Sequence, residues 1–204
     1  MLDARTEAQK VGVRSTEQSV DIKAGAFDHN IIIQSNSNMQ IESVRKMTTC
    51  DSADKRECRK EIIETYSAGE TFALGQRIGR EALPGQVYTL IGDLGVGKTV
   101  FTQGVADGLG ITEPVNSPTF TIVQIYEEGR MPFYHFDVYR IGDVEEMEEI
   151  GYEDCFYGEG LCLIEWANLI EEILPEHYRQ VTIEKDLEKG FDYRRITIEE
   201  RTTV

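Results

Sequence analysis

The sequence is short of basic residues, of cysteine and of long apolar runs. Its 204 residues include 21 Lys and Arg but 37 Asp and Glu, for a net charge of −16. Contacts with nucleic-acid phosphates need clustered cationic side chains, so this deficit argues against a free-standing DNA- or RNA-binding protein. No apolar run approaches the about 20 residues of a membrane-spanning helix, so we expect no membrane association.

The scarcity of cysteine excludes two further classes. No two of the four cysteines are spaced as CxxC, so we expect neither a zinc site nor a disulfide framework. Residues 1–10 (MLDARTEAQK) lack the apolar stretch of a secretory signal. Together these features are typical of a cytoplasmic protein with reduced thiols. The cysteines are Cys50, Cys58, Cys155 and Cys162.

Aromatic residues are almost missing from the first 59 positions, where Phe27 is the only one of the 18 in the chain. This segment holds nine acids and nine bases, so residues 60–204 carry the whole net charge. A segment with so little large apolar surface cannot bury a core of its own. We therefore predict that residues 1–59 form a disordered extension and that residues 60–204 form one domain.

Two alternatives remain open within this extension. Residues 30–34 (NIIIQ) have the composition of a short strand, and the natural start could lie downstream at Met39 or Met47. Because the segment adds little to a core, we expect a chain that begins near Lys60 to keep the activity of the whole protein.

From residue 60 onward, apolar residues follow strand and helix periodicities in turn. Ser67 and Glu70 have the spacing of a capping box, which predicts a helix that ends before Pro84-Gly85. A turn at 128–130 predicts a hairpin, and the C-terminal segments predict an antiparallel pair. This pattern predicts an α/β fold, a mixed sheet with helices on both faces. The predicted strands are 61–66, 86–91, 119–127, 132–138, 161–166, 179–184 and 194–199, and the further predicted helices are 100–109, 144–150 and 169–174.

Residues 92–99 (GDLGVGKT) match the pattern G-x-x-x-x-G-K-[ST] throughout. In such a loop the backbone N–H groups turn inward around a phosphate, and a Cβ at Gly92 or Gly97 would block that geometry. Lys98 would reach the β- and γ-phosphates, and the Thr99 hydroxyl would ligate Mg²⁺. The motif stands between an apolar strand and a helix, so we predict a P-loop NTPase-like fold. The loop residues assigned to nucleotide binding are Gly92, Asp93, Leu94, Gly95, Val96, Gly97, Lys98 and Thr99.

Two acids end apolar strands downstream of this loop. Asp137 ends FYHFD in the position of a Walker B carboxylate, although a strand-end Asp can also cap a turn. Glu165 ends LCLIE, and the carboxyl ends of strands in an open α/β sheet meet at one edge. Both acids could therefore face one phosphate site. Trp166, the only tryptophan, either packs over that site or fills the core.

The segment 116–121 (NSPTFT) lies between the phosphate loop and Asp137. Loops in this position respond to the γ-phosphate in many nucleotide switches. By position alone, an ordinary turn before a strand is equally expected.

Four motifs together resemble one family. GDLGVGKT, VNSPTFTIVQIY, FYHFDVYR and LIEW follow one another as in the TsaE (YjeE) family, and the resemblance covers about residues 61–200. It implies a P-loop ATPase that uses ATP and Mg²⁺ and works with the threonylcarbamoyl transferase TsaD and its partner TsaB. Those proteins modify adenosine 37 of tRNAs that read ANN codons. This chain would then meet tRNA only indirectly, and DNA not at all.

The resemblance also implies roles for single residues. Lys98, Asp137 and Glu165 would act in catalysis, and Thr99 and Glu165, with Asp137 in support, would hold the metal. Residues 1–59 have no counterpart in the family, and Ala167-Asn168-Leu169 lacks an acid that many relatives carry, so neither receives a role. The remaining implicated positions are Ser117 and Thr119 in the switch segment, Trp166, Ser67 and Thr71 near the adenine, and either Arg194 or Arg195 at the nucleotide.

Residues 143–172 contain eleven acids and no Lys or Arg. This run is either a solvated helical face or a docking surface for a basic partner. Two other functions compete with an accessory ATPase: a small-molecule kinase built on the same loop, and a nucleotide-gated binding module that hardly hydrolyses. A kinase usually carries an Arg-rich lid, whereas the region after Asp137 is acidic.

Overall fold

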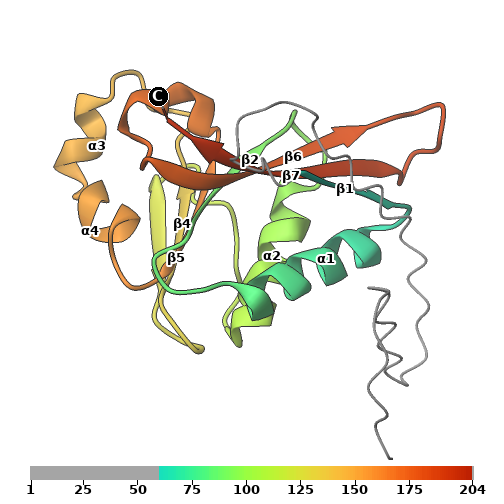
Figure 1. The fold of residues 1–204 in the computed structure, drawn as a ribbon, viewed down its shortest axis with the longest axis horizontal. Coiled ribbons are helices and arrows are strands. Elements are labelled where there is room, and N and C mark those ends of the chain that lie inside the picture. Colours follow the sequence, from blue (N-terminus) through green and yellow to red (C-terminus); the bar gives the residue numbers. More distant parts are fainter. Residues whose placement is uncertain (1–59, 204) are drawn as a thin grey trace, which may run out of the picture. The chain divides into compact units, whose positions relative to one another are not determined.

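The computed structural model describes residues 60–203 (Figure 1). The predicted extension 1–59, its strand at 30–34 and the alternative starts at Met39 and Met47 lie outside the described residues. No helix of residues 60–203 is long and apolar enough to span a membrane.

The described residues build a seven-stranded sheet in the order β1-β7-β6-β2-β5-β4-β3. The strands β6, β2, β5 and β4 run parallel to one another, whereas β1–β7, β7–β6 and β4–β3 are antiparallel pairs. The sheet is therefore mixed, as predicted. The elements are β1 (Lys60–Thr65), α1 (Ala68–Glu81), β2 (Val87–Ile91), α2 (Lys98–Leu109), β3 (Val123–Tyr126), β4 (Phe133–Asp137), α3 (Glu145–Glu149), α4 (Tyr152–Phe156), β5 (Leu161–Glu165), the 3-10 turns η1 (Ala167–Leu169) and η2 (Glu171–Ile173), β6 (His177–Lys185) and β7 (Arg194–Thr202).

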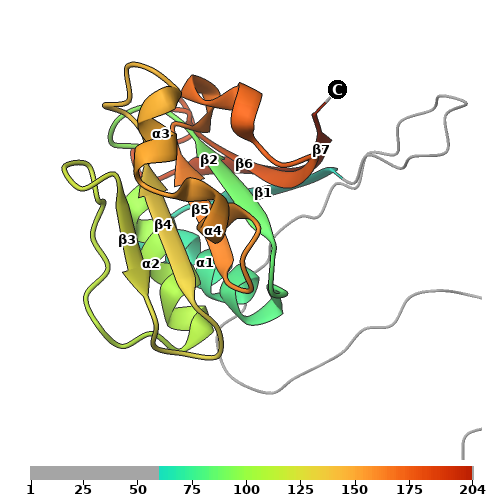
Figure 2. The ribbon, with the colours of Figure 1, turned by 90° about the vertical axis from the view of Figure 1, so that its left-hand side faces the viewer.

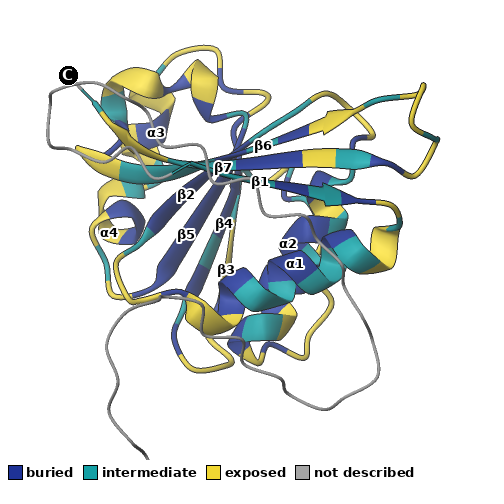
Figure 3. Cartoon of the chain, turned by 45° about the vertical axis from the view of Figure 1, so that its right-hand side comes forward, coloured by how far each residue is buried: buried dark blue, intermediate teal, exposed yellow. Residues whose placement is uncertain are grey.

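Side chains of the central strands point alternately to two helical layers. In β2, Tyr88 and Leu90 join the core that includes α1 and α2, whereas Val87 and Ile91 join the core that includes α3 and α4. Figures 1 and 2 show these helix pairs on opposite faces of the sheet. In Figure 3, β2 and β5 are dark blue between the two layers. The predicted α/β fold class is confirmed.

Helices α1 and α2 approach so closely that glycine is required at their contact. A Cβ at Gly104 would lie 2.2 Å from the carbonyl oxygen of Phe72, and one at Gly79 would lie 2.1 Å from that of Val105. Both distances are far below van der Waals contact, and the blocking atoms are backbone. The close contact fixes how α1 and α2 pack against each other. The glycines at this contact are Gly75, Gly79, Gly104 and Gly108.

We expect Gly104→Ala to lower the free energy of unfolding by about 1–3 kcal/mol, because the added methyl must push the two helices apart. Urea unfolding followed by circular dichroism measures the change. Gly69→Ala is the matched control, since its Cβ would meet only the Ser67 hydroxyl at 3.8 Å. Equal midpoints for the two variants would contradict the close-packing argument.

The first helix begins as predicted, with one difference in its cap. The N–H of Glu70 donates to the Ser67 hydroxyl (3.1 Å). The Glu70 carboxylate accepts from the N–H of Tyr66 (2.9 Å), one residue earlier than in the usual box. The cap therefore also ties the end of β1 to the start of α1.

The predicted strand 119–127 is wrong in its first half, because β3 starts only at Val123. The carbonyl of Pro118 accepts hydrogen bonds from the N–H groups of Thr121 (3.0 Å) and Ile122 (2.7 Å), which closes a turn. Ile122 then adopts a φ of 64°, a conformation that β-branched residues rarely occupy. This local turn replaces the strand pairing that the alternation predicted.

The predicted helix 169–174 is also wrong. Two 3-10 turns, η1 and η2, replace it, and Ile170 between them has a φ of −133° that no helix continues through. So short a stretch before Pro175 cannot accumulate a ladder of i→i+4 bonds. Helix α4 was missed because its five residues are too few to show a period.

Candidate functional site

The phosphate-loop motif follows β2 at the carboxyl edge of the parallel strands, where β4 and β5 also end. Gly92, Gly95 and Gly97 have φ values of 155°, 75° and 104°, which favour glycine. A Cβ at Gly92 would in addition lie 2.6 Å from the carbonyl oxygen of Ile183. These glycines are therefore needed by the backbone path of the loop itself.

Helix α2 begins immediately after the loop. Its N-cap is Gly97, and no side-chain capping hydrogen bond is present at this helix start within residues 60–203. Uncapped N–H groups at the positive end of a helix suit an anion. Thr99, in this first turn, is exposed and so available to a ligand.

Lys98 is the buried cation of the site, with 7% of its surface exposed. Its Nζ donates to the carbonyl oxygens of Gly92 (2.7 Å) and Asp93 (3.1 Å). Burial lowers the pKa of Lys98, and the charges of Glu165 and Asp137 oppose that shift. A phosphate oxygen carries negative charge, so it would bind the ammonium group more strongly than these neutral carbonyl oxygens do.

Trp166 lies over this ammonium group. Lys98 Nζ is 4.3 Å from the centroid of the indole ring, and Tyr139 packs against the ring at 5.0 Å. The backbone of Trp166 has a φ of 63°, unusual for a bulky residue. The half-buried ring also touches the core under α3 and α4. Both sequence alternatives hold in part, since the ring borders the core and covers the site.

Asp137 and Glu165 occur at the same level of neighbouring strands, because they are register partners in the β4–β5 pair. Both carboxyl groups are buried. Glu165 Oε1 is 3.0 Å from Nε2 of His135, which is also buried. His135 was not assigned a role from the sequence, although its spacing of two from Asp137 on a strand places both on one face.

Asp137 accepts hydrogen bonds from two hydroxyl groups of the predicted switch segment. The hydroxyls of Ser117 and Thr119 both donate to Asp137 Oδ2, that of Thr119 at 2.7 Å. Its Oδ1 accepts from the N–H of Tyr139 (3.2 Å), so Asp137 also caps the turn after β4. The structure thus brings together three predicted residues that are far apart in the sequence.

Of the two C-terminal arginines, Arg194 reaches the loop. Its Nε donates to the carbonyl oxygen of Val96 (2.6 Å), whereas Arg195 is exposed. Arg194 is the first residue of β7, next to the loop that joins β6 to β7. Glu64 of β1 anchors that loop, and its hydrogen bonds from Lys189 and Tyr193 lower its pKa to about 2.

Ser67 and Thr71 serve the local structure. Ser67 caps α1, and the Thr71 hydroxyl contacts that of Thr65 at 2.9 Å. No hydrogen bond recorded among residues 60–203 joins either side chain to the phosphate loop. Their proximity to an adenine remains a prediction.

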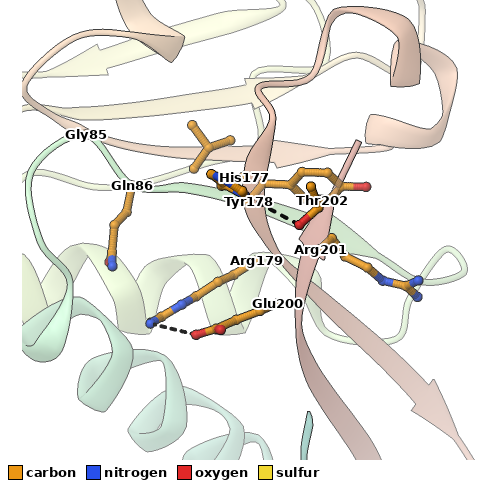
Figure 4. A pocket seen from close by; sticks show the side chains of 9 residues that line it. Gly85, Gln86, His177, Tyr178, Arg179, Glu200, Arg201 and Thr202 are labelled. Carbon is orange, nitrogen blue, oxygen red and sulfur yellow. Dashed lines mark hydrogen bonds and ion pairs between the residues drawn. The ribbon is translucent and has the colours of Figure 1, made fainter. Parts of the chain in front are cut away.

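A separate pocket of about 350 Å³ opens at the opposite, amino edge of the parallel strands (Figure 4). It is lined by the starts of β2 and β6 and the end of β7. Arg179, its central cation, already donates to the Tyr88 hydroxyl (2.8 Å) and to Glu200 (3.4 Å). The pocket shares no lining residue with the phosphate loop, which remains the candidate site.

The described residues offer only a few side chains that could bind a metal ion at this site. Within residues 60–203, no three His, Cys, Asp or Glu side chains gather into a metal centre. Mg²⁺ commonly uses one or two carboxylates and completes its shell with phosphate oxygens and water. The buried carboxylates of Asp137 and Glu165, near Lys98 of the GDLGVGKT loop, fit such a partial site.

The acids of residues 143–172 lie mainly on exposed surface. All the glutamates of α3 are exposed, as are Glu153 and Asp154 of α4. Glu165 is the buried exception. The exposure agrees with a solvated face and equally with a docking surface, so both alternatives stay open.

The chain is similar in sequence and in fold to known proteins. The family model described as threonylcarbamoyl adenosine biosynthesis protein TsaE matches residues 65–196. The chain is 51% identical over 133 residues to the tRNA threonylcarbamoyladenosine biosynthesis protein TsaE of Bacillus subtilis, covering 65% of this chain and 81% of that protein. The protein of the same name from Treponema pallidum is 45% identical over 111 residues, with 54% and 82% covered. The crystal structure of Bacillus subtilis YdiB is similar at a TM-score of 0.60 and 43% identity, covering 70% of this chain and 86% of that one.

Proposed function

The chain belongs to the TsaE family of threonylcarbamoyl adenosine biosynthesis proteins, and on that premise we propose that it is an Mg²⁺-dependent ATPase of tRNA modification. It would support the threonylcarbamoylation of adenosine 37 in tRNAs that read ANN codons. One observation carries the ATPase assignment: Asp137 and Glu165, which end two separate strands, lie close to Lys98 of the loop GDLGVGKT.

Lys98 supplies the positive charge of the proposed reaction. Its Nζ exchanges the carbonyls of Gly92 and Asp93 for phosphate oxygens, and its burial keeps competing water away. Charge that is already held in place stabilises the transferring phosphoryl group without reorganisation in the transition state. Arg194, bound to Val96, holds the loop in the conformation that receives the phosphates.

Thr99 and Glu165 are the residues that would hold Mg²⁺ directly, with Asp137 in support. The ion, when bound, neutralises charge on the β- and γ-phosphates. Asp137 would orient a water molecule as well, because its buried carboxylate can accept a proton or a hydrogen bond. Ser117 and Thr119, now bound to Asp137, can release it when a γ-phosphate offers them other acceptors.

TsaD- and TsaB-type proteins are the proposed partners, in the cytoplasm. The exposed acids of α3 and α4 suit a basic partner surface and would speed association by electrostatic attraction. The net charge of −16 makes direct retention of tRNA by this chain unfavourable.

Reconstitution tests the proposal. Purified TsaD- and TsaB-type partners, tRNA, ATP and the threonylcarbamoyl donor are incubated with the chain present or omitted, and modified adenosine is measured. The proposal expects modification to require the chain and ATP turnover to rise with the partners. Turnover that depends instead on an added small-molecule acceptor would favour the alternative, a P-loop kinase.

We expect ATP with Mg²⁺ to shift the fluorescence of Trp166, because phosphate binding must change the contact between the indole and Lys98. Fluorescence titration measures the shift, and Trp166→Phe, which should abolish it, is the control. A flat titration under conditions where calorimetry shows bound ATP would mean that the contact between Trp166 and Lys98 does not change when the nucleotide binds.

A further inference from the structure

His135 lies one diagonal step from Glu165 in the sheet. Glu165 is the register partner of Asp137, and His135 comes two residues earlier on the same strand. The His135 ring is fully buried, and its Nε2 stands 3.0 Å from Glu165 Oε1. Within residues 60–203, this is the hydrogen bond that the Glu165 carboxylate forms with another side chain.

The other ring nitrogen settles how this contact is made. His135 Nδ1 is buried and has no hydrogen-bond partner among residues 60–203. A buried N–H without an acceptor is costly, so the ring carries its proton on Nε2 and donates it to Glu165. A carboxylate oxygen can only accept, so the donor must be the histidine.

The ring cannot easily turn away from this contact. His135 stacks on Phe133 at a centroid distance of 5.9 Å and an interplanar angle of 12°. Phe133 in turn stacks on Tyr126 of the edge strand at 5.8 Å. Phe133 is itself fully buried. The stack therefore fixes the direction of the Nε2–H bond.

We propose that His135 is a positioning residue, which holds one oxygen of Glu165 so that the other stays available to the metal ion. This inference rests on the proposed function, since it assigns Glu165 to Mg²⁺. A hydrogen bond of this kind restricts the rotation of a metal-binding carboxylate, and its loss typically lowers metal affinity about 10- to 100-fold.

Two substitutions separate the donor from the ring. His135→Phe keeps an aromatic ring on Phe133 but removes the donor. His135→Gln removes the ring but can place an N–H group near the position of Nε2. We expect His135→Phe to weaken Mn²⁺ binding about 10-fold or more, and His135→Gln to stay within about 3-fold of the unaltered protein.

The measurement is a titration of Mn²⁺ into the full chain saturated with the non-hydrolysable analogue AMPPNP. The electron paramagnetic resonance signal reports free Mn²⁺, and AMPPNP alone provides the baseline. Thermal unfolding of each variant checks the fold. His135→Asn, which stops short of Glu165, replaces His135→Phe if that variant does not fold, and the same loss of affinity is expected.

The titration distinguishes failure of the proposed metal-dependent function from failure of the positioning role of His135. An unaltered chain that binds AMPPNP without retaining Mn²⁺ would overturn the metal-dependent function, and the role of His135 with it. Retention by the unaltered chain and by His135→Phe alike would overturn the positioning role alone. Equal weakening in the Phe and Gln variants would also overturn it, because the ring and not the donor would then matter.

Discussion

Lys98→Ala is expected to lower ATP hydrolysis about 100-fold or more, because it removes the cation that faces the transferring phosphate. The methyl group of alanine replaces none of the contacts of Nζ, which now reaches Gly92 and Asp93. The backbone of the loop stays, so nucleotide affinity should fall less than turnover. Steady-state phosphate release and calorimetric binding of ATP measure the two effects separately.

A matched control removes a lysine charge elsewhere. Lys185 is exposed at the end of β6, and Lys185→Ala should leave turnover unchanged. Thermal unfolding of all three proteins checks that a loss of turnover does not come from unfolding, since Lys98 is buried and its side chain contacts Gly92, Asp93 and Trp166. Unchanged turnover in Lys98→Ala would mean that GDLGVGKT does not act as a phosphate loop in this chain.

Glu165→Gln and Asp137→Asn are expected to change ATP turnover in different ways, the first through its Mg²⁺ requirement and the second through its rate. Glu165→Gln should need about 10-fold more Mg²⁺ for half-maximal turnover, because it weakens a direct ligand. Asp137→Asn should lower turnover about 100-fold at every Mg²⁺ concentration, because it removes the group that orients the water. The structure sharpens this contrast, since Asp137 is engaged by the hydroxyls of Ser117 and Thr119.

Turnover measured over a wide Mg²⁺ range separates the two assignments. Glu159→Gln is the control, because it removes a carboxylate charge from an exposed position. Rescue of Asp137→Asn alone by added Mg²⁺ would reverse the assignment and make Asp137 the direct ligand. Rescue of neither would leave Thr99 and the phosphates as the main metal ligands.

Local patterns made the site motifs predictable. The loop of residues 92–99 depends on glycines, Lys98 and Thr99 at fixed spacing, and every one of these lies within a single turn. The capping box at Ser67 and the buried strands β2 and β5 are equally local, because capping and period depend on neighbours in the sequence. Their boundaries agree with the structure to within one residue.

Segments that depended on competition between local and distant contacts were predicted less well. The turn at Ile122 and the 3-10 turns after Trp166 replace regular elements that periodicity indicated. Nothing in the sequence near the glycines of α1 and α2 indicates which helix they pack against. Their role becomes visible only when the two backbones are placed side by side.

The GDLGVGKT motif, the family and the two acids that end β4 and β5 could be recognised from the sequence alone. Tertiary structure was needed to show that Arg194, and not Arg195, contacts the loop, that Trp166 covers Lys98, and that His135 contacts Glu165. The physical reason is the same for each contact. Strand register and the direction of a side chain arise from the packing of the whole sheet, whereas the sequence shows directly only the spacing along one strand.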